Sequence, residues 1–128
     1  MTKLLLVGCG GFIGCCTRYL ISIIAARGFG DSFPYGTLIV NVLGSFLIGF
    51  IFASSLTVLN ISDNMKLFVM TGILGGLTTF STFSLDTISL IENKKILLAT
   101  SNIMLNVVFG LGGVITGKYF TKFFEKLL

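Results

Sequence analysis

The stretch that decides the fold is residues 72–84, which read Gly-Ile-Leu-Gly-Gly-Leu-Thr-Thr-Phe-Ser-Thr-Phe-Ser. Two adjacent glycines, Gly75 and Gly76, precede a run of leucine, threonine, phenylalanine and serine, and the whole stretch lies inside a long apolar segment. Glycines and hydroxyls in the middle of a membrane helix favour an interruption, because backbone groups can bond outside the helix there. We therefore predict a membrane-spanning helix that is broken at its centre.

Apolar segments of membrane length lie on both sides of this stretch. A lipid-spanning helix needs about 20 predominantly apolar residues. Segments that meet this requirement lie at residues 4–26, 35–59, 67–91 and 96–120. The predicted fold class is an all-α membrane protein, with residues 1–128 forming a single domain of four transmembrane helices.

The composition excludes several other classes of protein. Of the 128 residues, 54% are hydrophobic and 11% are charged, and the mean hydropathy is +1.00. Soluble domains carry roughly 25% charged residues, so this chain has too few to cover a water-facing surface. The chain has no histidine, and no nucleophile–base pair or set of metal ligands is visible in it. An enzyme is therefore the least favoured hypothesis. The basic residues stand at the ends of apolar runs, which predicts a lipid bilayer as partner and no nucleic acid.

Small residues in the apolar runs predict close helix packing. Gly8, Gly10 and Gly14 imitate a nucleotide-binding loop, but no alternation of strands and helices follows them, so packing is the preferred interpretation. Small residues also stand four apart at Gly10 and Gly14, Ser45 and Gly49, and Gly113 and Gly117. The cysteines are odd in number and confined to the first run, so we interpret them as small packing residues: Cys9, Cys15 and Cys16.

Two charged residues interrupt the apolar runs. Arg18 lies in the first run, where a charge at a helix centre costs about 2.5–3.5 kcal/mol on insertion scales. It could extend to the interface, or it could line a wet vestibule that attracts anions. Asp86, near the far end of the third run, is open to three interpretations: a charge partner, a vestibule residue or a helix-end residue.

Three amides and two phenylalanines are candidates for an ion pathway. Asn41 lies in the second run, and Asn102 and Asn106 share one face of the fourth. Buried amides need partners, so they join helices or offer N–H groups to an anion, and we favour a polar track. Phe80 and Phe83 are three apart, so their positive ring edges could meet a small anion without a full charge, or the rings could simply pack at a kink. A break also frees carbonyls for a hard cation such as Na⁺.

Three stretches together resemble a known family. They are Gly10-Gly-Phe-Ile-Gly14 with Arg18-Tyr19, Phe33-Pro-Tyr-Gly-Thr37 with Asn41, Gly44-Ser45 and Gly49, and Gly75-Gly-Leu-Thr-Thr-Phe-Ser-Thr-Phe-Ser84. Over nearly the full chain they are similar to the bacterial fluoride channels known as Fluc or CrcB. The resemblance implies a multi-pass protein of the bacterial cytoplasmic (inner) membrane that exports fluoride passively and protects the cell from fluoride toxicity. It further implies an antiparallel homodimer with two pores and a structural sodium ion at the dimer centre.

The resemblance also implies roles for individual residues. The sodium ligands would be the backbone carbonyls of Gly75 and Thr78. Arg18 would supply the vestibule charge. The fluoride pathway would contain Asn41, Phe80, Ser81, Thr82, Phe83, Asn102 and Asn106. In some members of the family the polar track of the fourth helix consists of tyrosine and serine at a spacing of four, and it would fall on Asn102, Asn106 and Gly110, where the side chains differ. No role is carried over to Asp86, where the family often has glutamate.

The distribution of basic residues independently predicts insertion in both orientations. The side that holds both termini carries Lys3, Lys66, Lys118, Lys122 and Lys126. The opposite side carries Arg27, Lys94 and Lys95, and Arg18 if its side chain extends there. Because orientation follows the asymmetry of Lys and Arg near helix ends, this near balance predicts dual topology. Opposed copies could then pair about a two-fold axis.

Two other functions remain as alternatives. A small four-helix, dual-topology exporter of organic cations is expected to carry an acidic residue deep in a helix and aromatic rings for cation–π binding. This chain has Arg18 in its first helix instead and lacks tryptophan. A membrane-anchored structural subunit without transport is the second alternative, and ion flux through the purified protein would exclude it.

Overall fold

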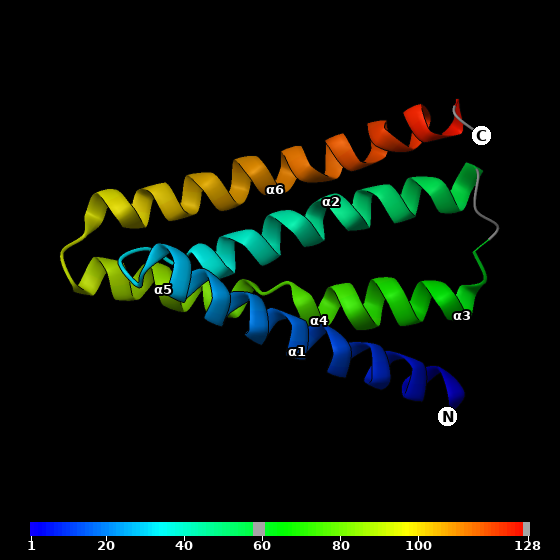
Figure 1. The fold of residues 1–128 in the computed structure, drawn as a ribbon, viewed down its shortest axis with the longest axis horizontal. Coiled ribbons are helices and arrows are strands. Elements are labelled where there is room, and N and C mark those ends of the chain that lie inside the picture. The colour runs from blue at the N-terminus through cyan, green and yellow to red at the C-terminus, as the bar shows by residue number, and fades with distance from the viewer. Residues whose placement is uncertain (58–60, 127–128) are drawn as a thin grey trace.

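The computed structural model describes residues 1–57 and 61–126, and these residues are built from helices and short connections. Figure 1 shows long helical segments that run alongside one another. Four of the described segments are long and apolar enough to cross a membrane. They are α1 (Thr2–Phe29), α2 (Tyr35–Thr57), a composite third span (Asp63–Glu92) and α6 (Ile96–Glu125). The predicted all-helical fold with four membrane-length helices is confirmed for the single chain.

The third span is assembled from four pieces. They are α3 (Asp63–Lys66), the π-helix η1 (Leu67–Leu74), α4 (Gly75–Leu77) and α5 (Phe80–Glu92). Ser62 caps the start, because its hydroxyl accepts the N–H of Met65 at 3.3 Å. Between α4 and α5 the backbone is extended at Thr78 (φ −81°, ψ 157°) and Thr79 (φ −153°, ψ 124°). The predicted interruption is therefore confirmed, and it falls on the two threonines that follow the glycine pair.

Glycines let α1 cross the first half of the third span at close range. Gly10 and Gly14 are buried, and a Cβ at Gly14 would collide with the carbonyl oxygen of Ile73. From the opposite side, a Cβ at Gly76 would lie 2.7 Å from the carbonyl oxygen of Gly11. Small residues allow such backbone contact in lipid, where the hydrophobic effect adds little to helix association. The contact holds the helix break in place against α1.

The second close pair is α2 with α6, which run alongside each other in Figure 1. A Cβ at Gly49 would collide with the backbone of Val114, and one at Gly117 with the backbone of Phe46. Nearer the C-terminus the buried hydroxyls of Ser54 and Thr121 lie 3.2 Å apart. The close packing predicted from the spaced small residues is thus confirmed, and the structure adds which helices each pair joins.

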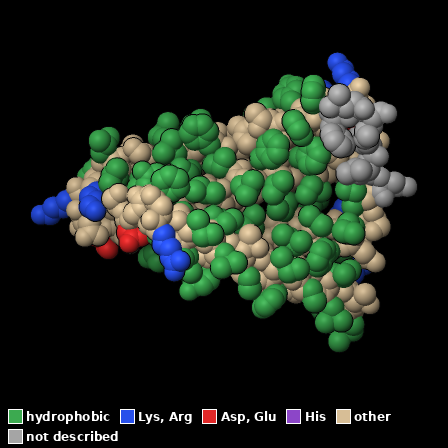
Figure 2. Space-filling view, in the orientation of Figure 1, with side chains coloured by type: hydrophobic (Ala, Val, Ile, Leu, Met, Phe, Trp, Pro, Cys, Tyr) green, Lys and Arg blue, Asp and Glu red, His purple; other side chains and the backbone are tan. Residues whose placement is uncertain are grey.

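The surface matches a protein surrounded by lipid. Hydrophobic side chains cover most of the face seen in Figure 2, and the lysine and arginine side chains visible there lie toward its ends. Large apolar side chains such as Phe12, Leu97 and Leu111 are 72%, 79% and 64% exposed. A surface of this kind is stable in hydrocarbon and unstable in water.

One sequence interpretation is wrong at this level. Cys9, Cys15 and Cys16 are exposed on α1 and do not pack inside the chain. Cysteine is small and weakly polar, so an exposed position on a membrane helix tolerates it as well as a packed one does. The pattern of the sequence cannot separate those two environments.

The helices also extend past the predicted apolar runs. α1 begins at Thr2 and ends at Phe29, and α6 continues to Glu125 instead of ending at residue 120. Lysine, arginine and glutamate are good helix formers, so polar ends continue a helix beyond the part that crosses lipid. The predicted end of the second helix at residue 59 lies outside the described residues.

Candidate functional site

The site is centred on the helix break, where the backbone of Thr78 and Thr79 is extended. The hydroxyl oxygen of Thr79 accepts the N–H of Thr82 at 3.1 Å, so Thr79 is the N-cap of α5. The same hydroxyl donates to Oγ1 of Thr82 at 3.0 Å and lies 3.3 Å from that of Ser81. A threonine cap therefore restarts the helix after two extended residues.

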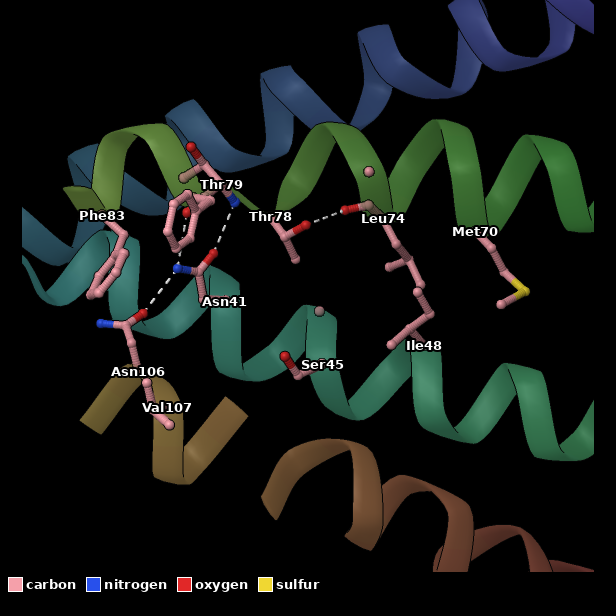
Figure 3. A pocket seen from close by; sticks show the side chains of 13 residues that line it. Asn41, Ser45, Ile48, Met70, Leu74, Thr78, Thr79, Phe83, Asn106 and Val107 are labelled. Atoms are coloured by element: carbon pink, nitrogen blue, oxygen red, sulfur yellow. Dashed lines mark hydrogen bonds between the residues drawn. The ribbon is translucent and has the colours of Figure 1, made fainter. Parts of the chain in front are cut away.

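Asn41 of α2 bonds directly to the displaced peptide. Its Oδ1 accepts the N–H of Thr79 at 2.9 Å, and its Nδ2 donates to the carbonyl oxygen of Thr79 at 3.1 Å (Figure 3). Gly44, one turn along α2, leaves room for the methyl group of Thr78, with which a Cβ would collide. The amide thus supplies the acceptor that the N–H of Thr79 loses at the break, and it adds a second donor to the carbonyl of this N-cap residue.

The break also leaves two carbonyl oxygens without their usual helical donors. In a continuous helix the N–H of Thr79 would bond Gly75 and the N–H of Thr82 would bond Thr78. Here those two N–H groups bond the Asn41 amide and the Thr79 hydroxyl instead. The resemblance assigns the sodium ion to the carbonyls of Gly75 and Thr78, and these carbonyls fit a hard cation that prefers oxygen ligands.

A groove of about 440 Å³ opens beside the break. We call it the central groove, and Figure 3 shows the side chains that line it. Its lining residues are Asn41, Gly44, Ser45, Ile48, Met70, Leu74, Gly75, Thr78, Thr79, Phe80, Phe83, Asn106 and Val107. Lysine, arginine, aspartate and glutamate are absent from this lining, so amides, hydroxyls and backbone groups supply its polarity.

The two candidate phenylalanines border the central groove. Their ring centroids are 5.6 Å apart and the rings are tilted by 48°. Phe80 is 80% exposed in the single chain, whereas Phe83 is partly buried. A tilted pair presents ring edges as well as faces, and the edges carry the positive end of the quadrupole. The two rings lie on one side of α5, as their spacing predicts, and the structure places them in the same groove lining as Asn41.

The fourth-helix amides join the same set of hydrogen bonds. Nδ2 of Asn41 donates to Oδ1 of Asn106 at 2.9 Å, and Nδ2 of Asn106 donates to Oδ1 of Asn102 at 2.9 Å. Asn106 lines the central groove, but Asn102 is 0% exposed and lies behind it. The structure therefore brings all three predicted amides together and places one of them outside the groove lining.

Two further cavities lie toward the end of the molecule where α1 meets α2. One of about 320 Å³ is lined by Arg18, Thr82 and Thr79, among others, and the other, of about 410 Å³, includes Asp86 and Lys95. They share Ser22, Thr37 and Thr82. We call the two cavities the vestibule.

Both charged residues that interrupt the apolar runs face the vestibule. Arg18 is partly buried, and its guanidinium lies 3.6 Å from the sulfur of Cys15. Asp86 accepts a hydrogen bond of 2.7 Å from the hydroxyl of Thr37. Ser81, in contrast, is exposed and belongs to neither cavity lining nor to the central groove.

Sequence reasoning missed two residues of this site, Thr79 and Thr87. Thr79 lines both the central groove and the vestibule, and its peptide anchors Asn41. Thr87, on α5, is 6% exposed and accepts a hydrogen bond from Asn102 at 2.9 Å. Thr79 could have been noted as one more hydroxyl in the threonine-rich stretch, whereas no signal marks Thr87.

Comparison with known proteins places the chain in a family. A family model described as CrcB-like protein, Camphor Resistance (CrcB), matches residues 5–118. A protein of Clostridium perfringens named fluoride-specific ion channel FluC is 58% identical over 121 residues, covering 92% of this chain and 94% of that protein. Proteins of the same name from Clostridium novyi and Methanococcus aeolicus are each 51% identical, and they cover 95% and 84% of this chain. The chain therefore belongs to the CrcB-like protein family.

Proposed function

We propose that this chain is the subunit of a fluoride-selective channel that exports fluoride passively across the cytoplasmic membrane. Its relatives carry the name fluoride-specific ion channel at up to 58% identity over most of the chain. The observation that carries the proposal is the central groove, which gathers amides, hydroxyls and two phenylalanine rings at a helix break in mid-span. A channel function agrees with the expectation from the sequence that the protein is not an enzyme.

The chemistry of the groove suits a small anion. Fluoride is strongly hydrated, so a pore must replace its water with hydrogen-bond donors and yet release it quickly. Neutral donors and ring edges attract an anion more weakly than a buried lysine would, and the lining of the groove has no charged side chain. An ion that enters can take the place of the Asn106 oxygen as acceptor for an N–H of Asn41.

The vestibule provides a route from the membrane surface. Arg18 adds a positive charge there, and the hydroxyl groups of Thr37 and Thr82 continue inward. Thr79 belongs to the lining of both the vestibule and the central groove. A fluoride ion would pass from Arg18 along these hydroxyls to Asn41 and the phenylalanine pair.

An antiparallel homodimer completes the proposal. Phe80 is 80% exposed although it lies near the middle of a membrane span, so a second copy is needed to close the pathway around it. The Gly75 and Thr78 carbonyls of two copies would surround one sodium ion with four oxygens, and this ion is structural. The two copies would give two equivalent pores by symmetry.

Dual topology can be tested by fixing the orientation of each copy. A pair of lysines added to the 92–95 connection, and separately to the N-terminus, should lock opposite orientations because basic residues stay on the cytoplasmic side. Each variant should be inactive alone, and co-expression should restore flux. Full activity from one locked variant would refute the antiparallel arrangement.

Passive flux distinguishes this function from the alternative exporter of organic cations. Purified protein in liposomes should release fluoride down its gradient, measured with a fluoride electrode, when no proton gradient is present. An antiporter would need that gradient. Fluoride release that appears only with an imposed proton gradient would contradict the proposed function.

A further inference from the structure

The hydrogen bonds that begin at Asn41 do not stop at the central groove. Asn102, behind the groove, donates from Nδ2 to Oγ1 of Thr87 at 2.9 Å. Thr87 in turn donates its hydroxyl proton to the carbonyl oxygen of Phe83 at 2.8 Å. The series therefore leaves the third span at Thr79, crosses α2 and α6, and returns to α5 at Thr87 and Phe83. We call this series, which runs from Thr79 through Asn41, Asn106, Asn102 and Thr87 to Phe83, the amide relay.

The relay has only one possible direction. A backbone N–H can only donate and a backbone carbonyl can only accept, and the relay ends on one of each, at Thr79 and Phe83. Because the hydroxyl proton of Thr87 is used on Phe83, its oxygen must accept from Asn102. The oxygen of Asn102 then faces the N–H groups of Asn106. Each amide is thereby fixed against a flip of its oxygen and nitrogen.

The remote end of the relay is sealed from the pathway. Asn102 is 0% exposed and Thr87 is 6% exposed, and neither lines the central groove. In such surroundings a polar group that loses its partner is costly, so the two residues constrain each other strongly. They reach the groove only through Asn106, which also donates to the backbone oxygen of Asn102 at 3.0 Å.

We propose that Thr87 and Asn102 are positioning residues that hold the side chain of Asn106 at the central groove and, through it, the N–H of Asn41 that donates to Asn106. The proposal rests on the proposed fluoride channel. In this proposal Asn102 acts through Asn106 and does not itself contact the fluoride ion. Thr87, which carries no signal in the sequence, holds the side chain of Asn102 against Asn106, whereas backbone groups of Thr79 and Asn102 already set which way the two groove amides point.

Replacing Thr87 with valine tests this role, because valine keeps the shape of threonine and lacks its hydroxyl. Fluoride throughput in liposomes should fall about fivefold, the factor that corresponds to one neutral hydrogen bond. Thr87→Ser, which keeps the hydroxyl, should restore most of it. Thr121→Val is the matched control, since Thr121 is 1% exposed and bonds Ser54 and the Gly117 carbonyl away from the relay. The control should keep wild-type throughput.

Two further measurements separate positioning from packing. If Thr87 acts through Asn106, Thr87→Val should lower throughput no further in an Asn106→Ala background, because the two effects are not independent. In protein labelled with ¹⁵N-asparagine, the side-chain signals of Asn41 and Asn106 should move in Thr87→Val, return in Thr87→Ser and stay fixed in Thr121→Val. Thr87→Ala replaces the valine variant if the latter does not fold.

The inference is overturned if the asparagine signals do not move, if serine performs as poorly as valine, or if the losses from Thr87 and Asn106 add independently. Failure of the proposed function looks different, because wild-type protein would then release no fluoride at all. The NMR signals report on the relay even in that case.

Discussion

Asn41 bonds both backbone groups of Thr79, accepting its N–H at 2.9 Å and donating to its carbonyl oxygen at 3.1 Å. One amide on α2 thus provides the acceptor that the N–H of Thr79 loses at the break, and it also donates to the carbonyl of the same residue. The same exchange leaves the carbonyl of Gly75 without its helical donor. The polar groove and the candidate sodium ligands therefore share one structural cause.

Asn41→Asp should reduce fluoride throughput at least about tenfold, a factor equivalent to roughly 1.4 kcal/mol. The carboxylate still accepts the N–H of Thr79 but has no N–H for Thr79 or Asn106, and its charge repels an anion. Liposome efflux measures the loss. Asn64→Asp, at an exposed position on α3, adds the same charge and should leave the rate unchanged. Wild-type throughput from Asn41→Asp would exclude this amide from the pathway.

Phe80→Ile and Phe83→Ile should each lower fluoride throughput while the protein remains folded and monodisperse in detergent. Isoleucine keeps apolar bulk and removes the electropositive ring edge. The control is Phe109→Ile, since Phe109 faces a separate apolar groove between α2 and α6. If both substitutions at the central groove left throughput at the control level, the rings would serve packing alone.

Gly14→Ala should destabilise the protein by about 1–3 kcal/mol, the usual cost of overpacking. The added methyl group would collide with the carbonyl of Ile73, and neither backbone can retreat without opening the contact between α1 and the third span. Gly112→Ala is the matched control, because a Cβ there meets no atom within 4 Å. Thermal unfolding in detergent compares them, and equal midpoints would contradict the close contact.

Removal of sodium should abolish fluoride flux reversibly. The proposed ion would be held by carbonyl oxygens, so a side-chain substitution at Thr78 leaves its ligand in place and an ionic test is the better one. Protein stripped of Na⁺, with a bulky organic cation as the only replacement, should lose activity and regain it when Na⁺ returns. Full activity after thorough stripping would contradict the site.

Much of this arrangement follows from the sequence because it depends on local chemistry. Apolar runs predict the four spans, paired small residues predict close helix packing without naming the partners, and the stretch at residues 72–84 predicts the break. Asn41 is a candidate because a mid-span amide must have partners. Each of these inferences needs only the residue and its neighbours along the chain.

The remainder depends on distances between helices. Thr87 and Asn102 are 15 residues apart, and only the packing of α5 on α6 brings their side chains together. The enclosure of Asn102 and the exposure of Cys9 likewise depend on the rotation of each helix about its axis. The apolar pattern defines that rotation poorly, because these helices are hydrophobic on nearly every side.

The central claim is selectivity for fluoride, and efflux of two halides from the same liposomes tests it most directly. Vesicles that contain purified protein are loaded with the potassium salts of fluoride and chloride and diluted into a halide-free medium, valinomycin lets K⁺ leave to balance the charge, and ion-selective electrodes follow both anions. The account predicts rapid release of fluoride while chloride stays inside until detergent is added. Equal release of fluoride and chloride would contradict it.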